Sequence, residues 1–175
     1  MKWTEQTMQA ALSTASFLST SVLVVPNCCW TGNETDMLVI EPNGRIVDIE
    51  VKISRADLKA DAKKDKWWKP RPWSRRHAPR EPAQWPAKVW KHYYAFPAEL
   101  WDDKLLEHLP PASGVLLVGK QGGPFVEVKR RAKPNKDAKP VATADVWNLA
   151  RLSSLRYWAI ARERIAKDQL TGAPT

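Results

Sequence analysis

Segment 35–52 contains two carboxylates and an amine whose types and spacing suit a divalent-cation site. Asp36 lies in one run rich in Val and Ile, and Glu50 and Lys52 lie two residues apart in the next run. Residues two apart on a strand project from the same face of a sheet. Two neighbouring carboxylates repel each other, and a hard cation with oxygen ligands, such as Mg2+, relieves that repulsion. The alternative is an exposed hairpin whose charges form a cross-strand ion pair.

The turn between the two runs determines which residues face each other. Pro42-Asn43-Gly44 fits a three-residue loop, in which a type I turn is followed by a left-handed glycine. Closing this loop pairs Glu41 with Arg45 and, further along the ladder, Asp36 with Glu50. A two-residue loop would shift the register by one position and send the side chains of the two acids to opposite faces. We therefore predict the three-residue loop, which places both acids and the amine in one cluster.

The flanking elements predict an α/β domain in the order helix, three strands, helix, strand. Thr4 can cap a first helix, and the β-branched residues 21–25 predict a strand that ends before Pro26. The hairpin supplies the next two strands. Residues 54–66 begin with a cap-x-x-acid pattern that predicts a second helix, and residues 92–96 predict the strand that follows.

The remainder of the chain is predicted to form scaffold. Residues 97–109 predict a short helix, and the apolar residues 114–119 predict a strand buried on both faces, followed by a strand at 125–128. Asp145 can cap a last helix over about residues 146–167. Four of its apolar residues are expected to face inward: Leu149, Leu152, Leu155 and Trp158. We expect a single domain over residues 1–175, because this length suits one hydrophobic core.

Asp36, Glu50 and Lys52 resemble the signature of the PD-(D/E)XK superfamily, the restriction-endonuclease-like nucleases. In that family an Asp on one strand and an acid-x-Lys on the next hold the catalytic metal, and the core has the same order of elements as the one predicted above. Thr35 stands where the family has a proline before the Asp. The stretch 50–57 looks most like the MmcB-type DNA-repair branch. The implied fold is a mixed central sheet flanked by helices.

The resemblance also implies a function, that of a Mg2+-dependent nuclease hydrolysing DNA phosphodiester bonds in DNA repair, recombination or phage DNA processing. Asp36, Glu50 and the backbone carbonyl of Val51 would hold the metal, which Mn2+ can replace. Lys52 would orient the attacking water and offset charge on the phosphoryl oxygens. Two alternatives remain open: a non-catalytic nucleic-acid-binding module that keeps the fold, and an enzyme that cleaves RNA.

Many members of the superfamily add an acid from the first helix, and Glu5 is the candidate here. Glu5 shares a helix face with Met8 and Leu12, so we expect it to point inward with them. The alternative is an acid that stabilises the helix N-terminus through the macrodipole alone.

A long insertion at about residues 67–91 combines positive charge with tryptophan and proline. Between Lys63 and Lys91 the chain has ten basic residues against two acidic ones, and five Pro residues disfavour regular structure. Cations that meet phosphates and indoles that stack on unpaired bases match a nucleic-acid surface. The alternative is that the tryptophans pack under the loop while the basic residues stay solvated.

A second basic run, residues 129–136, follows the predicted strand at 125–128. It is either a further phosphate contact or an ordinary solvated linker. Together the two basic segments supply the candidate nucleic-acid-binding residues. They are Lys63, Lys64, Lys66, Trp67, Trp68, Lys69, Arg71, Arg75, Arg76, Arg80, Lys129, Arg130 and Arg131.

Other features of the chain argue against several classes of protein. Cys28 and Cys29 are adjacent, a poor geometry for a disulfide between them, and no zinc-ligand spacing surrounds them. No apolar run reaches the length of a membrane span, and Glu5 with repeated Ser and Thr interrupts the segment that resembles a signal peptide. We expect a cytoplasmic protein without a signal peptide, and its net charge of +9 fits DNA as the partner.

Overall fold

The computed structural model describes residues 2–61, 63–69, 73, 77, 79–120 and 123–171. The chain divides into two compact units, Met1–Pro140 and Val141–Thr175. The single domain expected over residues 1–175 stays a prediction. The first unit contains the sheet and all the residues predicted to form the catalytic site. The described part of the second unit contains one long helix, and each unit is described by itself.

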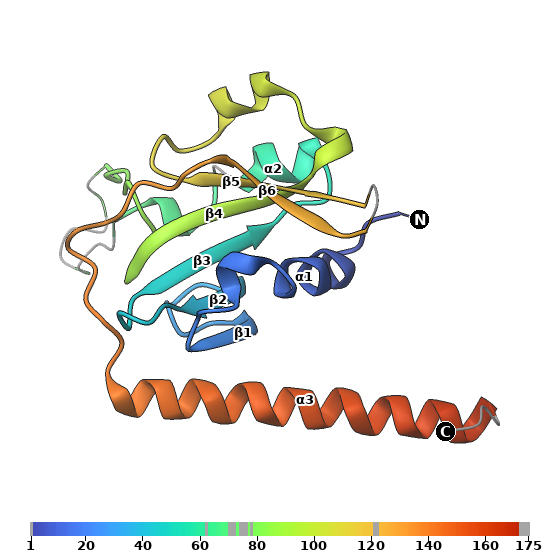
Figure 1. Ribbon diagram of the computed structural model, residues 1–175. Helices are drawn as coiled ribbons and strands as arrows, with labels where there is room; N and C mark the ends of the chain where they lie inside the picture. Colours follow the sequence, from blue (N-terminus) through green and yellow to red (C-terminus); the bar gives the residue numbers. More distant parts are fainter. Residues whose placement is uncertain are drawn as a thin grey trace. The chain divides into compact units, whose positions relative to one another are not determined.

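The first unit is built on a six-stranded mixed sheet (Figure 1), as the sequence predicted. The strands lie side by side in chain order: β1 (Leu23–Cys28), β2 (Thr35–Ile40), β3 (Ile46–Val51), β4 (Val89–Pro97), β5 (Gly114–Gly119) and β6 (Phe125–Arg130). The first three strands form an antiparallel meander. β4 and β5 run parallel to β3, and β6 returns antiparallel to β5.

The β2–β3 hairpin has the predicted three-residue loop and register. Met37 pairs with Ile49, and the backbone N–H of Glu41 donates to the carbonyl of Arg45 over 3.0 Å. Gly44 has φ +74°, the left-handed conformation that this loop requires and that glycine adopts without strain. The observed pairing confirms the predicted register. The turn residues and the buried face of the strands favour the same pairing.

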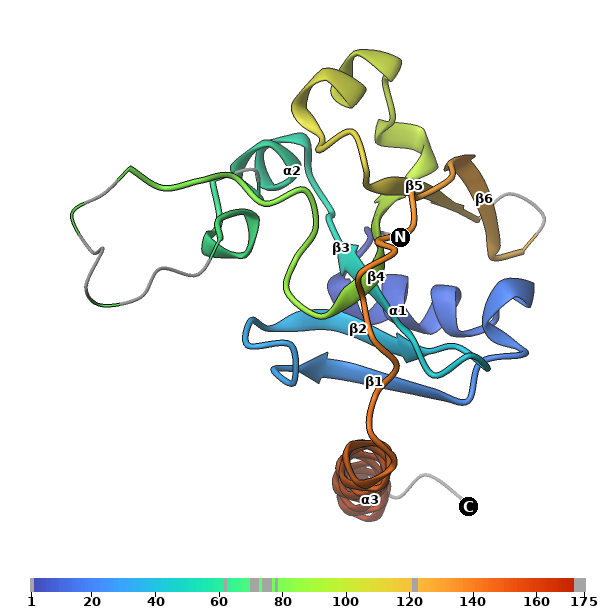
Figure 2. The ribbon, with the colours of Figure 1, turned by 90° about the vertical axis from the view of Figure 1, so that its left-hand side faces the viewer.

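Helices cover both faces of the sheet (Figures 1 and 2), with α1 (Glu5–Ser13) on one face and α2 (Arg55–Asp61) on the other. Thr4 and Thr7 form a capping box that begins α1, and Met8 and Leu12 are fully buried against the sheet. The hydroxyl of Ser54 accepts a hydrogen bond from the N–H of Asp57, which begins α2. α2 lies in the crossover between the parallel strands β3 and β4.

Several element boundaries differ from the sequence prediction. β1 continues through Pro26 to Cys28, because a proline without an N–H is tolerated on an edge strand. β4 begins at Val89, three residues earlier than predicted. The helix predicted over residues 54–66 ends at Asp61, and a short 3-10 helix, η2 (Asp65–Trp67), follows it. The helix predicted at 97–109 is two 3-10 helices, η4 (Ala98–Leu100) and η5 (Asp103–His108).

The second unit contains α3 (Thr143–Thr171), which is longer at both ends than the predicted helix 146–167. The expected inward orientation of Leu149, Leu152, Leu155 and Trp158 on this helix stays a prediction. Within the described part of the chain, no helix combines the length and the apolar character needed to cross a membrane.

Candidate active site

Strand β3 and the residue that follows it present three charged side chains on one face of the sheet. Asp48, Glu50 and Lys52 alternate with apolar residues that belong to the core beneath α1: Val47, Ile49 and Val51. This alternation follows from the two-residue period of a strand. The charged face therefore points toward α2 and η2, and all three charged residues are buried.

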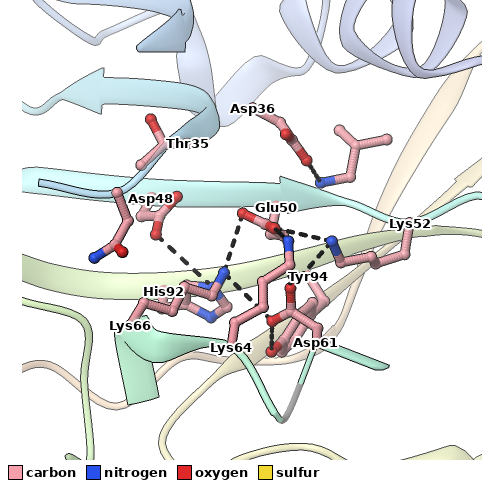
Figure 3. A network of polar contacts seen from close by, with 12 residues as sticks. Thr35, Asp36, Asp48, Glu50, Lys52, Asp61, Lys64, Lys66, His92 and Tyr94 are labelled. Atoms are coloured by element: carbon pink, nitrogen blue, oxygen red, sulfur yellow. Dashed lines mark hydrogen bonds and ion pairs between the residues drawn. The ribbon is translucent and has the colours of Figure 1, made fainter. Parts of the chain in front are cut away.

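Glu50 lies at the centre of a cluster of ammonium groups (Figure 3). Its carboxylate is 1% exposed and lies near three lysines. The Nζ atoms of Lys52 and Lys64 lie 2.9 Å and 2.7 Å from its Oε1, and the Nζ of Lys66 lies 3.1 Å from its Oε2. Every oxygen of Glu50 is thus in contact with a cation.

Asp61, the last residue of α2, is the second carboxylate of this cluster. It is fully buried, and its Oδ1 lies 2.9 Å from the Nζ of Lys64 and 3.1 Å from the Nζ of Lys52. Tyr94 and Trp67 donate hydrogen bonds to its Oδ2 over 2.5 Å and 3.2 Å. Asp61 is not among the site residues predicted from the sequence. The signal that could have found it is its position three residues after Leu58, on the apolar face of the same helix.

Opposite charges keep this cluster ionised. Burial disfavours the charged forms of Glu50 and Asp61, but the ammonium groups of Lys66 and Lys52 outweigh burial and hold the pKa of each acid below its usual value. Burial also lowers the pKa of Lys52, yet Glu50 and Asp61 reverse that effect and raise it. The pKa of Lys64 is raised in the same way. Lys52 is therefore held as an ammonium group, which donates a hydrogen bond to Glu50.

Asp36 lies at the edge of the cluster, at the beginning of β2. Its Oδ2 accepts a hydrogen bond from the backbone N–H of Val51 over 2.6 Å. Burial and the nearby charge of Glu50 raise the pKa of Asp36 to about 6, although the hydrogen bond from Val51 opposes this rise. Among the residues that the structure describes, no ion pair joins Asp36 to Lys52. The structure thus brings Glu50 and Lys52 into direct contact and places Asp36 beside them.

Glu5 is exposed, which corrects the expectation that it points inward with Met8 and Leu12. Its Oε1 accepts a hydrogen bond from the Nε2 of Gln9 over 3.2 Å. That same nitrogen donates to the backbone carbonyl of Asp36 over 3.0 Å. Glu5 is therefore linked to the site through Gln9 and through its charge, which contributes slightly to the raised pKa of Asp36.

The donor set of the cluster fits a hard cation, although its present arrangement does not form a metal cage. Within the described ranges, no three His, Cys, Asp or Glu side chains are arranged to hold a metal ion. Yet the Oε2 of Glu50 and the Oδ1 of Asp61 are buried oxygens that accept no hydrogen bond. Carboxylate oxygens of this kind are the ligands that Mg2+ and Mn2+ prefer.

Asp48 and His92 form a buried pair next to the cluster. The Nε2 of His92 lies 3.8 Å from the Oδ2 of Asp48, and the Nδ1 of His92 lies 3.0 Å from the hydroxyl of Ser113. Burial raises the pKa of Asp48 to about 7 and lowers the pKa of His92 well below its usual range. Both residues are at most 1% exposed, so they belong to the interior of the protein next to the cluster.

An Asp48→Asn variant is expected to lose part of the pH dependence of folding. The folded pKa of about 7 lies above the usual value of 3.8, so between these values the folded protein retains a proton that the unfolded chain has released. The stability from Asp48 is therefore fully present below the unfolded pKa. It is lost as the pH rises through 7, by at most about 1.4 kcal/mol per pH unit.

Urea denaturation of wild type and Asp48→Asn between pH 5 and pH 8 measures this effect. The free energy of unfolding of wild type should fall more steeply with pH than that of the variant. Parallel curves would show that Asp48 does not titrate in this range.

The predicted nucleic-acid-binding residues are divided between the surface and the interior. Lys66 and Trp67 are 5% exposed, and this corrects their assignment as surface contacts. Lys66 pairs with the buried acids of the cluster, and Trp67 packs its ring against His92 with 4.9 Å between ring centroids. Arg130 is half-buried and donates to the backbone carbonyls of Ser113 and Pro110, so its guanidinium group serves the fold.

The other candidates are exposed, half-buried or outside the described residues. Lys63, Lys64, Lys69, Arg80, Lys129 and Arg131 are exposed, and Trp68 is half-buried. Lys69 pairs with Glu81 over 2.9 Å, Arg80 with Asp65, and Lys129 with Asp103 over 3.0 Å. Arg71, Arg75 and Arg76 lie outside the described residues. The described part of the insertion thus keeps exposed cations, several of them in surface ion pairs.

Comparisons with known proteins establish the fold alone. No family model matches the chain, and no curated protein matches it. Among solved structures, the chain is similar to "SPO1766 protein of unknown function from Silicibacter pomeroyi", with 21% sequence identity and a TM-score of 0.54. The match covers 97% of this chain and 95% of the other. This protein therefore has a mixed α/β fold, with a six-stranded mixed sheet and a C-terminal helix.

Proposed function

We propose that this protein is a metal-dependent nuclease of the PD-(D/E)XK type that hydrolyses DNA phosphodiester bonds. The observation that carries the proposal is the buried contact between Glu50 and Lys52, 2.9 Å long, beside the carboxylate of Asp36. Burying two charges is costly, and a chain that only needed stability would gain as much from apolar residues at these positions. The order helix, three strands, helix and strand supports a restriction-endonuclease-like core.

The proposal gives each residue of the site a role. Asp36, Glu50 and the carbonyl of Val51 would hold a Mg2+ or Mn2+ ion. When bound, such an ion polarises the phosphate and lowers the pKa of its water. Lys52 is held as an ammonium group by Glu50 and Asp61, so it can donate a hydrogen bond to the attacking water and offset negative charge on the phosphoryl oxygens.

The charge of the surface near the site favours a nucleic-acid substrate. Lys63 and Lys64 are exposed in the turn that joins α2 to η2, directly beside the cluster. Lys69, Arg80 and Arg131 are exposed elsewhere on the first unit, Lys69 and Arg80 in surface ion pairs. Positive charge near a metal site attracts a polyanionic strand and releases its counterions. A role in DNA repair, as in the MmcB-type branch, is part of the proposal.

An assay with three metal conditions tests the proposal. Wild type and Lys52→Ala are incubated with circular double-stranded DNA, with single-stranded DNA and with single-stranded RNA, in Mg2+, Mn2+ or EDTA. We expect wild type to cut DNA in either metal and not in EDTA, and Lys52→Ala to bind DNA and cut at least about 100-fold more slowly. If both proteins bind DNA equally and cut it in no condition, the non-catalytic nucleic-acid-binding module is favoured. If wild type cuts RNA but not DNA, the substrate is RNA.

A further inference from the structure

Lys64 occupies the space between the two buried carboxylates of the cluster. Its Nζ lies 2.7 Å from the Oε1 of Glu50 and 2.9 Å from the Oδ1 of Asp61. The two acids are 1% and 0% exposed, whereas the side chain of Lys64 is 48% exposed. Figure 3 shows its ammonium group directed at both acids. A cation that enters from solvent thus bridges two anions that belong to the protein interior.

A divalent ion can take this position only if the ammonium group of Lys64 leaves it. Three ammonium groups, those of Lys52, Lys64 and Lys66, lie within 4 Å of Glu50 and Asp61, and the partly exposed Asp57 lies 3.9 Å from Lys52. The ammonium groups would repel a divalent ion added at close range. Lys52 and Lys66 are 4% and 3% exposed and cannot reach solvent without opening the core. Lys64 can turn outward, because its four-carbon stem is flexible and half of it is already exposed.

The two oxygens at this position are bound unequally. The Oε1 of Glu50 accepts hydrogen bonds from the Nζ atoms of Lys52 and Lys64 over 2.9 Å and 2.7 Å. The Oδ1 of Asp61 lies 2.9 Å and 3.1 Å from two ammonium nitrogens, yet within the described residues it accepts no well-aligned hydrogen bond. A buried anionic oxygen beside positive charge, and not aligned to an N–H bond, is one that a spherical metal ion can bind.

We infer that the position of the Lys64 ammonium group is a divalent-cation position, with Glu50 and Asp61 as its ligands. Lys64 holds this position until the ion arrives, and then turns outward to pair with a phosphate of the substrate. Asp61 is thereby a metal ligand that the acid-x-Lys pattern does not include. The inference rests on the proposed function, because Glu50 belongs to both.

Mn2+ binding in the absence of DNA tests the inference. Free Mn2+ is followed by electron paramagnetic resonance during titration of wild type, Lys64→Met, Asp61→Asn and Lys59→Met. Lys59 is exposed on α2, so its replacement makes the same charge change away from the acids. We expect Lys64→Met to tighten Mn2+ binding by about tenfold, Asp61→Asn to weaken it by about tenfold or more, and Lys59→Met to match wild type.

Each outcome decides the inference. If Lys64→Met binds Mn2+ with an affinity equal to or weaker than that of wild type, the inference is overturned. This variant alone decides the inference if Asp61→Asn does not fold. Unchanged Mn2+ affinity in a folded Asp61→Asn would remove Asp61 from the ligand set and overturn it as well. If wild type cuts DNA but Lys64→Met binds Mn2+ no better, only the inference fails. If Mn2+ binding follows the expected order but DNA is not cut, only the proposed function fails.

Discussion

Replacing Asp36 with asparagine is expected to slow DNA cleavage by about 1,000-fold, which corresponds to about 4 kcal/mol of transition-state stabilisation. The asparagine side chain keeps an oxygen that can accept the hydrogen bond from the N–H of Val51. It loses the negative charge that would hold the metal. Because only the charge changes, a loss of cleavage would report on metal binding and not on unfolding.

Stability measurements separate these two causes. The pKa of Asp36, about 6, lies above its usual value of 3.8, so ionisation of Asp36 weakens the folded state as pH rises through 6. A neutral asparagine removes that cost, and the variant should be at least as stable as wild type at pH 7. Glu34→Gln is the matched control, because Glu34 is an exposed acid two residues away. If Asp36→Asn cleaved DNA at the wild-type rate, Asp36 would have no part in the chemistry.

Replacing Glu50 with alanine is expected to destabilise the folded protein by about 3 to 5 kcal/mol. Glu50 is in contact with three ammonium groups, and two of them, those of Lys52 and Lys66, are nearly inaccessible to solvent. Without Glu50, Asp61 alone would face these cations. A buried charge that loses its partner keeps its full desolvation cost, which makes this substitution far more costly than the loss of one surface ion pair.

Urea denaturation of Glu50→Ala at pH 7 measures this loss, and Glu81→Ala is its control. Glu81 also pairs with a lysine, Lys69, but both side chains are well exposed, so its removal should cause no measurable change. Glu50→Gln should fall between the two, because a neutral amide can still accept hydrogen bonds from the ammonium groups. A Glu50→Ala protein as stable as Glu81→Ala would show that the cluster is hydrated and adds little to folding.

The hairpin shows what local sequence determines well. The loop 42–44 specifies its own conformation through proline, asparagine and glycine, and the alternation of apolar residues along β2 and β3 specifies which face is buried. Both signals act over a few residues, so the pairing of Met37 with Ile49 is predictable from the amino-acid sequence alone. The contact of Glu50 with Lys52 follows from the same short-range rule.

The insertion shows where a prediction from amino-acid composition fails. Lys66 and Trp67 belong to a segment with many exposed cations, and composition assigns every member the same environment. The structure turns the chain at Lys63 and Lys64, and this turn directs Lys66 to the two buried acids and Trp67 to His92. No local sequence pattern predicts that the carboxylate of Glu50, 16 positions earlier in the chain, neutralises Lys66.

By itself the sequence determined the order of the elements, the hairpin register and the pair formed by Glu50 and Lys52. Turn chemistry, capping and side-chain periodicity encode these features over distances of a few residues. Only the tertiary structure decided that Asp61 completes the cluster, that Lys64 bridges the two acids, and that Lys66 and Trp67 are buried. These contacts depend on how α2 and η2 pack against the sheet, and that packing is set by the whole core rather than by any local pattern.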